Sequence, residues 1–127
     1  MSKIILVFLG GGAGAVARWF VGVQAMRAMG AAWPYGTFIV NVVGGLCMGL
    51  LVGVLAHRGG ADQDRWRVLL GVGVLGGFTT FSAFSLETAL MIEKRDYGQA
   101  LTYVAASVLL SVAALFLGMV VSRRLFA

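Results

Sequence analysis

Four apolar runs, each long enough to cross a lipid bilayer, occupy almost the whole of this 127-residue chain. A transmembrane helix needs roughly 20 apolar residues, so four such helices fit in the chain and five do not. The composition agrees, because 60% of the residues are hydrophobic and 12% are charged, whereas a soluble domain carries about 25% charged residues. The sequence therefore predicts an all-α membrane protein with a single domain over residues 1–127. Its four transmembrane helices are expected at about residues 4–26, 34–56, 66–93 and 98–122.

The third run contains a polar stretch that does not suit a continuous membrane helix. Residues 76–87 combine two adjacent glycines with four hydroxyl side chains and a carboxylate. Adjacent glycines weaken a helix, and Thr79 and Thr80 offer the backbone alternative hydrogen bonds. Within a membrane, unpaired backbone groups are tolerated only where protein or a water-filled cavity surrounds them. We therefore expect the third helix to break near its middle, over residues 76–80.

The residues after this break have the chemistry of a weak anion path. Phe81 and Phe84 lie on one helical face, and Glu87 follows one turn after Phe84. The edge of a phenylalanine ring is positive and its faces are negative, so ring edges combined with hydroxyl and amide donors attract an anion without holding it tightly. Conduction requires such weak, repeated contacts, because a tightly bound ion does not leave. Packing of both rings in a hydrophobic core is the alternative interpretation.

Polar residues in the first two helices extend this pattern. Arg18 lies within the first span and has no acidic residue within a helical turn. It is either a side chain that reaches back to the membrane interface or a fixed positive charge at the mouth of an anion path. Thr37 and Asn41 are four residues apart and therefore share a helical face. Asn41 either joins two helices by hydrogen bonds or donates its N–H groups to an anion in a pore.

Two further series with a four-residue spacing stand out. Glycines in the second helix form one stripe, which favours close packing against another helix or another subunit. Residues with hydroxyl groups in the fourth helix line one face in the same way. The glycines are Gly45, Gly49 and Gly53, and the hydroxyl-bearing residues are Tyr103, Ser107 and Ser111.

Charged residues lie mainly at the helix ends, so the net charge of +5 indicates contact with lipid headgroups or an anion path, not with nucleic acid. If both termini and the 57–67 loop share one side of the membrane, that side holds six basic residues and the other holds three. This bias is small enough to be compatible with insertion in both orientations. Four short helices do not easily enclose a pore, so an oligomer is expected. The first side has Lys3, Arg58, Arg65, Arg67, Arg123 and Arg124, and the second has Arg27, Lys94 and Arg95.

Several other classes of function fit the sequence poorly. The chain has one histidine, His57, and one cysteine, Cys47, so it cannot assemble a zinc site from these ligands, and no nucleophile–base pair suggests an enzyme. A small proton-coupled multidrug exporter also has four helices, but its mechanism needs a carboxylate deep in the first helix, and residues 4–56 contain no Asp or Glu. A non-conducting scaffold built on glycine packing would leave Asn41 and Glu87 without a role.

Three motifs together identify a family. They are Gly76-Gly77-Phe78-Thr79-Thr80-Phe81-Ser82-x-Phe84-Ser85-x-Glu87, Gly11-Gly12-x-Gly14-x-x-x-Arg18 and Gly36-Thr37-x-x-x-Asn41-x-x-Gly44. Their residues and spacing resemble those of the Fluc (CrcB) family of bacterial fluoride channels, and the resemblance covers essentially the whole chain. The family often has threonine where this chain has Ala83, so one hydroxyl group of its polar track is missing here.

The resemblance implies an antiparallel, dual-topology homodimer in the bacterial inner membrane, with two fluoride pores along the subunit interface. It implies passive efflux of fluoride from the cytoplasm. It also implies one structural Na⁺ on the dimer axis, held by backbone carbonyls of Gly76 and Thr79 from both subunits. By the same resemblance Phe81 and Phe84 present ring edges to fluoride, and Asn41 presents its amide. The other residues that we expect along the path are Arg18, Thr37, Ser82, Glu87, Tyr103, Ser107 and Ser111.

Overall fold

The computed structural model describes residues 2–58 and 60–126, almost all of them helical. The segments are α1 (Lys3–Met29), α2 (Tyr35–Arg58), a 3₁₀ turn (Gly60–Asp62), α3 (Gln63–Trp66), a π-helix (Arg67–Leu75), α4 (Gly76–Phe78), α5 (Phe81–Glu93) and α6 (Tyr97–Phe126). They make four rods that are long and apolar enough to span a membrane, and the third rod comprises the segments from Gly60 to Glu93. The prediction of an all-helical chain with four membrane-length helices is therefore confirmed.

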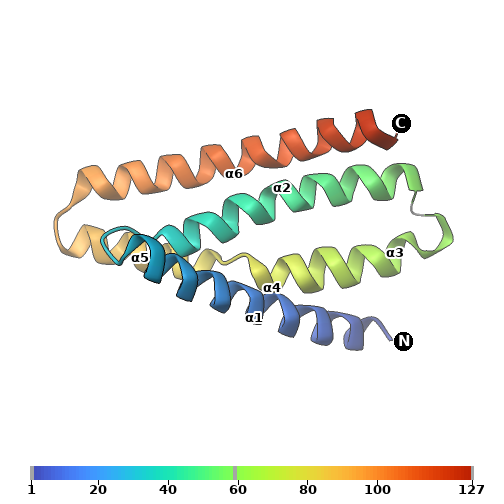
Figure 1. Ribbon diagram of the computed structural model, residues 1–127, viewed down its shortest axis with the longest axis horizontal. Coiled ribbons are helices and arrows are strands. Elements are labelled where there is room, and N and C mark those ends of the chain that lie inside the picture. The colour runs from blue at the N-terminus through green and yellow to red at the C-terminus, as the bar shows by residue number, and fades with distance from the viewer. Residues whose placement is uncertain (1, 59, 127) are drawn as a thin grey trace.

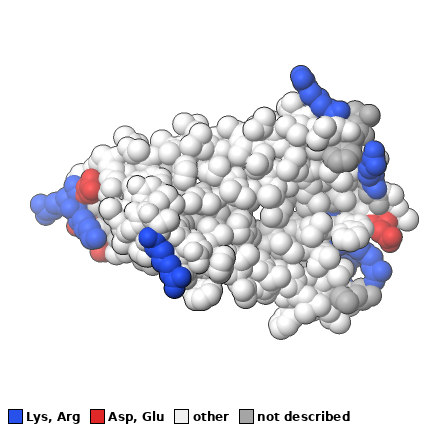
Figure 2. Space-filling view, in the orientation of Figure 1, with Lys and Arg blue, Asp and Glu red and all other residues white. Residues whose placement is uncertain are grey.

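The four rods lie side by side and change direction at each connection (Figure 1). Both termini and the connection between α2 and α3 are at one end of the bundle, and the α1–α2 and α5–α6 connections are at the other. Most lysine and arginine side chains gather at these two ends, and the surface between them is largely uncharged (Figure 2). This distribution suits a bundle whose middle is in lipid and whose ends are at the two membrane surfaces.

Large apolar side chains cover the outside of the bundle, and glycines form much of its inside. Ile4 is 82% exposed and Phe8 is 78% exposed, as expected for residues in contact with lipid. The glycine stripe of α2 faces α6, and a Cβ atom on Gly49 would overlap the carbonyl oxygen of Leu115. The stripe that the sequence assigned to helix or subunit packing therefore brings two helices of one chain together.

The third rod is interrupted at only two residues. Thr79 (φ −85°, ψ 159°) and Thr80 (φ −149°, ψ 118°) are extended and separate α4 from α5. Gly76 has helical angles (φ −61°, ψ −38°), so the break begins later than the expected residues 76–80. Close packing explains why residue 77 is a glycine, because a Cβ atom there would overlap the backbone of Gly11 in α1.

Two ion pairs lie at the end of the bundle that holds the N-terminus. Asp64 in α3 pairs with Lys3 of α1, and also accepts a hydrogen bond of 2.8 Å from Nη2 of Arg67. These side chains are about half exposed or more, so each pair contributes little stability by itself. Of the two, only the Lys3–Asp64 pair connects α1 to the start of the third rod.

Candidate functional site

The interruption of the third rod is held open by Asn41 of α2. The Nδ2 group of Asn41 donates to the carbonyl oxygen of Thr80 at 3.0 Å, and the backbone N–H of Thr80 donates to Oδ1 of Asn41 at 2.8 Å. One side-chain amide therefore satisfies both backbone groups of an extended residue, as a neighbouring strand would. This is the helix-joining role of the two that the sequence left open. The second N–H of the amide remains as a further donor.

Side chains of Thr79, Thr80 and Arg18 hydrogen-bond to backbone groups of the two helix ends that meet at the break. Oγ1 of Thr80 accepts the backbone N–H of Ala83 at 3.2 Å, which caps the start of α5. Oγ1 of Thr79 donates to the carbonyl oxygen of Leu75 at 3.0 Å. Nε of Arg18 in α1 donates to the carbonyl oxygen of Gly77 at 3.1 Å. Helix ends leave backbone groups unpaired, and these contacts satisfy part of them within the membrane span.

A cavity of about 410 Å³ adjoins the break, and we call it the phenylalanine cavity. The ring centroids of Phe81 and Phe84 are 5.6 Å apart and their planes are inclined by 44°, so the rings do not stack face to face. Phe81 is 77% exposed, whereas Phe84 is 9% exposed. The predicted residues in its lining are Asn41, Gly76, Thr79, Phe81, Phe84, Ser107 and Ser111.

Two serines of α6 bring hydroxyl groups to the phenylalanine cavity. The Oγ atoms of Ser107 and Ser111 are buried, and among the described residues neither has a hydrogen-bond partner. Buried polar atoms in proteins are nearly always hydrogen-bonded. These two hydroxyl groups are therefore suited to a partner that enters the cavity.

Glu87 is the centre of a second polar cluster, about one helical turn from Phe84. Its Oε1 accepts Oγ1–H of Thr37 at 2.5 Å, and its Oε2 accepts the hydroxyl group of Tyr103 at 3.2 Å. Tyr103 is fully buried. Its ring packs against Phe84, with centroids 5.1 Å apart, and edge-on against Trp33, with centroids 5.2 Å apart. The tyrosine therefore joins the phenylalanine cavity to the carboxylate.

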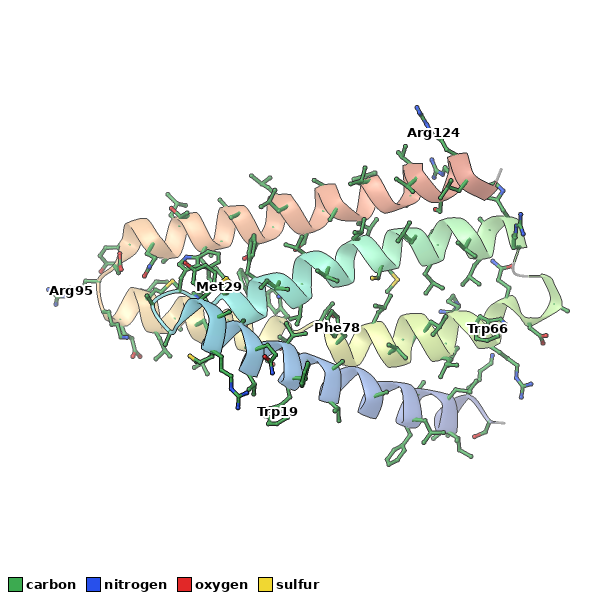
Figure 3. All side chains as sticks on the ribbon, in the orientation of Figure 1. Trp19, Met29, Trp66, Phe78, Arg95 and Arg124 are labelled. Carbon is green, nitrogen blue, oxygen red and sulfur yellow. The ribbon has the colours of Figure 1, made fainter. Side chains whose placement is uncertain are left out.

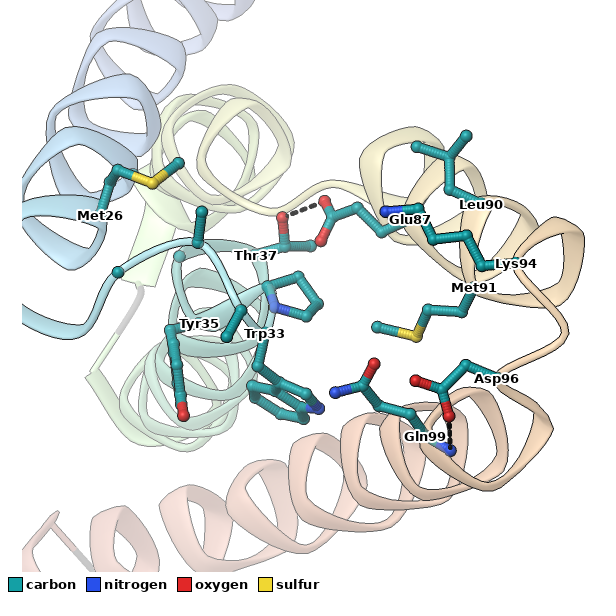
Figure 4. Close-up of a pocket in the computed structure, with 16 residues that line it drawn as sticks. Met26, Trp33, Tyr35, Thr37, Glu87, Leu90, Met91, Lys94, Asp96 and Gln99 are labelled. Atoms are coloured by element: carbon teal, nitrogen blue, oxygen red, sulfur yellow. Dashed lines mark hydrogen bonds between the residues drawn. The ribbon is translucent and has the colours of Figure 1, made fainter.

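Glu87 and Thr37 also line a pocket of about 380 Å³ at the end of the bundle, which we call the glutamate pocket (Figure 4). Lys94 and Asp96 contribute the other charged side chains among its described lining residues. A third pocket, of about 520 Å³, lies between α1, α2 and α5, and we call it the arginine groove. Arg18 and Arg27 line it together with residues of α2 and α5.

The structure distributes the predicted site residues over these three neighbouring spaces. Seven of them line the phenylalanine cavity, while Thr37 and Glu87 line the glutamate pocket and Arg18 lines the arginine groove. Tyr103 lies between the first two. Ser82 is exposed at the start of α5, with its Oγ atom 3.3 Å from Oγ1 of Thr80. The predicted residues thus come from α1, α2, α4, α5, α6 and the break between α4 and α5.

Sequence reasoning missed three residues of this region. Thr80 was assigned to the break but not to the site, although it is the residue that Asn41 holds. Its sequence signal was a threonine directly before the helical residues that follow the break. Trp33 packs against Tyr103, and this contact has no local sequence signal. Arg27 was counted only for topology, yet it lines the arginine groove.

Metal ligands of the usual kind are not grouped in the described part of the chain, where no three His, Cys, Asp or Glu residues come together. Backbone oxygen atoms are available at the break. A regular helix would pair the carbonyl oxygen of Gly76 with the N–H of Thr80, but that N–H donates to Asn41. Gly76 and Thr79 also line the same cavity. Both carbonyl groups therefore fit a hard cation such as Na⁺, which prefers oxygen ligands.

Comparison with known proteins shows the family of this chain. A family model described as "CrcB-like protein, Camphor Resistance (CrcB)" matches residues 5–119. A protein of Caulobacter sp. (strain K31) named "Fluoride-specific ion channel FluC" is 68% identical over 127 residues, which is all of this chain and 99% of the relative. Proteins with the same name from Caulobacter vibrioides (strain NA1000 / CB15N) and Phenylobacterium zucineum (strain HLK1) are 68% and 65% identical, each over the full length of both chains. The chain therefore belongs to the CrcB-like (FluC) family.

Proposed function

We propose that this protein is a fluoride-selective ion channel that lets fluoride leave the cytoplasm passively. The observation that carries the proposal is the pair of buried, unpartnered hydroxyl groups of Ser107 and Ser111 in the same cavity as Phe81 and Phe84. Weak donors beside aromatic rings suit a small anion that must bind and leave quickly. Full-length relatives are named fluoride-specific ion channels, and these names support the choice of fluoride.

In the proposed path, fluoride loses its hydration shell gradually against donors of this chain. The ring edges of Phe81 and Phe84 offer weak positive charge, and the hydroxyl groups of Ser107 and Ser111 offer hydrogen bonds. Asn41 contributes the amide hydrogen that it does not give to Thr80. No single contact is strong, so the ion is not trapped.

The Glu87 cluster extends the proposed path toward the end of the bundle. Thr37 and Tyr103 donate to its two carboxylate oxygens, so these hydroxyl groups are held in fixed positions. Fluoride that passes Phe84 would compete with the Glu87 carboxylate for the hydrogens of these two hydroxyl groups. Ser82 would extend the path on the other side of Phe84, and Arg18 would offer positive charge near the break.

The path needs a second copy of the chain, and we propose an antiparallel homodimer. Phe81 is 77% exposed in one chain, so the side of the phenylalanine cavity that its ring lines is not covered by that chain. A second chain packed against this side would enclose the ring and close the cavity, and two-fold symmetry would create two such paths. The small bias of basic residues between the two ends, six against three, is compatible with the opposite orientations that this dimer requires.

A structural Na⁺ at the centre of this dimer is part of the proposal. The carbonyl oxygens of Gly76 and Thr79 from both chains would hold it, because the break frees them from helical hydrogen bonds. Such an ion would add a fixed positive charge between the two chains and stabilise their contact. It would not travel with fluoride.

The proposed localisation is the bacterial inner membrane, with passive efflux as the direction. Hydrogen fluoride is a weak acid that crosses lipid as a neutral molecule and dissociates in the more alkaline cytoplasm. The trapped anion can then leave through a channel down its electrochemical gradient, with no energy coupling. A proton-coupled exporter is disfavoured, since no carboxylate is present between residues 4 and 56.

Anion efflux from liposomes tests the proposal directly. Purified protein is reconstituted into vesicles loaded with fluoride or chloride, and efflux is followed with an ion-selective electrode after the membrane potential is shunted. We expect rapid loss of fluoride and almost no loss of chloride. Equal rates for the two anions, or no fluoride efflux above that of protein-free vesicles, would refute it. Fluoride flux driven by a Na⁺ gradient would contradict the structural role of Na⁺.

A further inference from the structure

Two pockets of the structure include Thr37 in their lining, and they differ in charge. The glutamate pocket contains Glu87, Lys94 and Asp96, so its charged side chains sum to one negative charge when all are ionised. The charged residues among the described lining of the arginine groove are Arg18 and Arg27, both positive. An anion that approaches this end of the bundle is therefore attracted to the arginine groove and not to the glutamate pocket.

The inner part of the arginine groove has a positive charge in a fixed position. Arg18 is half-buried, and its Nε group donates to the carbonyl oxygen of Gly77 beside the break. An arginine has five N–H donors, so four remain to meet an anion. Thr37 and Thr80 also line the groove, which places it next to the residues that hold the break.

The outer part of the groove contains Arg27, a residue to which the proposed path gives no role. Arg27 is in the last turn of α1, and its side chain is exposed. No acidic residue forms an ion pair with it in the described part of the chain, residues 2–58 and 60–126. Its charge is therefore not cancelled by a neighbour, and it acts on ions in the adjoining water.

We propose that Arg27 is the steering charge at the mouth of the arginine groove, through which fluoride approaches the path already proposed for Arg18. This inference rests on the proposed channel function and adds to it the route of approach. Arg27 raises the local concentration of anions, and Arg18 receives them deeper in the groove, beside Thr80. Arg27 acts through the electrostatic field and does not bind the ion in the narrow path.

Electrostatic steering has a characteristic dependence on ionic strength. The Debye length is about 30 Å at 10 mM salt and about 3 Å at 1 M. The field of an exposed charge therefore reaches along the groove at low salt and is screened within one side-chain diameter at high salt. Removing the charge of Arg27 should lower fluoride conductance by about two- to threefold at 10 mM salt and leave it almost unchanged at 1 M.

Single-channel conductance in planar bilayers tests this dependence, because it does not depend on the amount of protein inserted. Conductance is measured at about 10 mM and about 1 M fluoride for the wild type, Arg27→Gln, Arg27→Lys and Arg95→Gln. Arg95 lies at the same end of the bundle and points outward (Figure 3), and it lines neither pocket. Its variant therefore removes the same charge from the same membrane surface.

We expect Arg27→Gln alone to lose conductance at low salt and to match the wild type at high salt. Arg27→Lys keeps the charge and should behave as the wild type. Equal effects of Arg27→Gln and Arg95→Gln, or an Arg27→Gln loss that persists at 1 M fluoride, would overturn the steering role. If the wild type conducts no fluoride, the proposed channel function fails; if it conducts and Arg27→Gln equals it at both concentrations, only the steering proposal fails.

Discussion

Replacing Asn41 with alanine removes the two hydrogen bonds that hold the interruption of the third rod. The N–H and carbonyl groups of Thr80 both lose their side-chain partner. Hydrogen bonds within membrane proteins are worth about 0.6 kcal/mol on average and up to about 1.7 kcal/mol, so two such bonds give about 1 to 3 kcal/mol. Two backbone groups left fully unpaired would cost about 2 to 6 kcal/mol.

The smaller range is the expected result, because the chain has an alternative. Without Asn41, the N–H of Thr80 can return to the carbonyl oxygen of Gly76, as in a regular helix. The break would then shorten or close, and the carbonyl group proposed to hold Na⁺ would be consumed. We therefore expect Asn41→Ala to lose about 1 to 3 kcal/mol of stability and most fluoride conductance.

Two measurements check this prediction. The free energy of unfolding is compared by denaturant titration in detergent, and exchange of the Thr80 amide hydrogen reports its pairing directly. Val43→Ala is the matched control, since it truncates a 41% exposed side chain of the same helix and should cost less than about 0.5 kcal/mol. Unchanged stability together with unchanged protection of the Thr80 amide would refute the reasoning.

Four further substitutions and one control test conduction and packing. Phe81→Ile and Phe84→Ile should both abolish most fluoride efflux from liposomes, and Phe84→Ile should also lower thermal stability, since Phe84 is 9% exposed within one chain; normal efflux in both variants would disprove the ring-edge role. Gly49→Ala should destabilise the bundle by about 1 to 3 kcal/mol in unfolding titrations, because its Cβ atom would overlap α6, whereas Gly12→Ala, with open space around it, should be nearly neutral. Tyr103→Phe should cost about 1 kcal/mol in the same titrations through the lost hydrogen bond to Glu87; a neutral result would show that this bond contributes nothing.

The sequence by itself determined the class of fold and the approximate position of the site. Four apolar runs in 127 residues leave few alternatives to four membrane helices, and the structure has them. The glycine stripe of α2 and the serines of α6 could be placed on helical faces because the period of a helix is local information. The three motifs together were sufficient to identify the family, which the match over residues 5–119 confirms.

Only the tertiary structure decided which groups meet. Asn41 and Thr80 are 39 residues apart in the chain, and Thr37 and Glu87 are 50 residues apart; no local pattern pairs such residues. The length of the break was likewise not set by local propensity, because adjacent glycines weaken an isolated helix whereas Gly76 and Gly77 are helical in the folded bundle. Helical periodicity assigns a residue to a face, but the packing of the helices determines which residue of another helix it contacts.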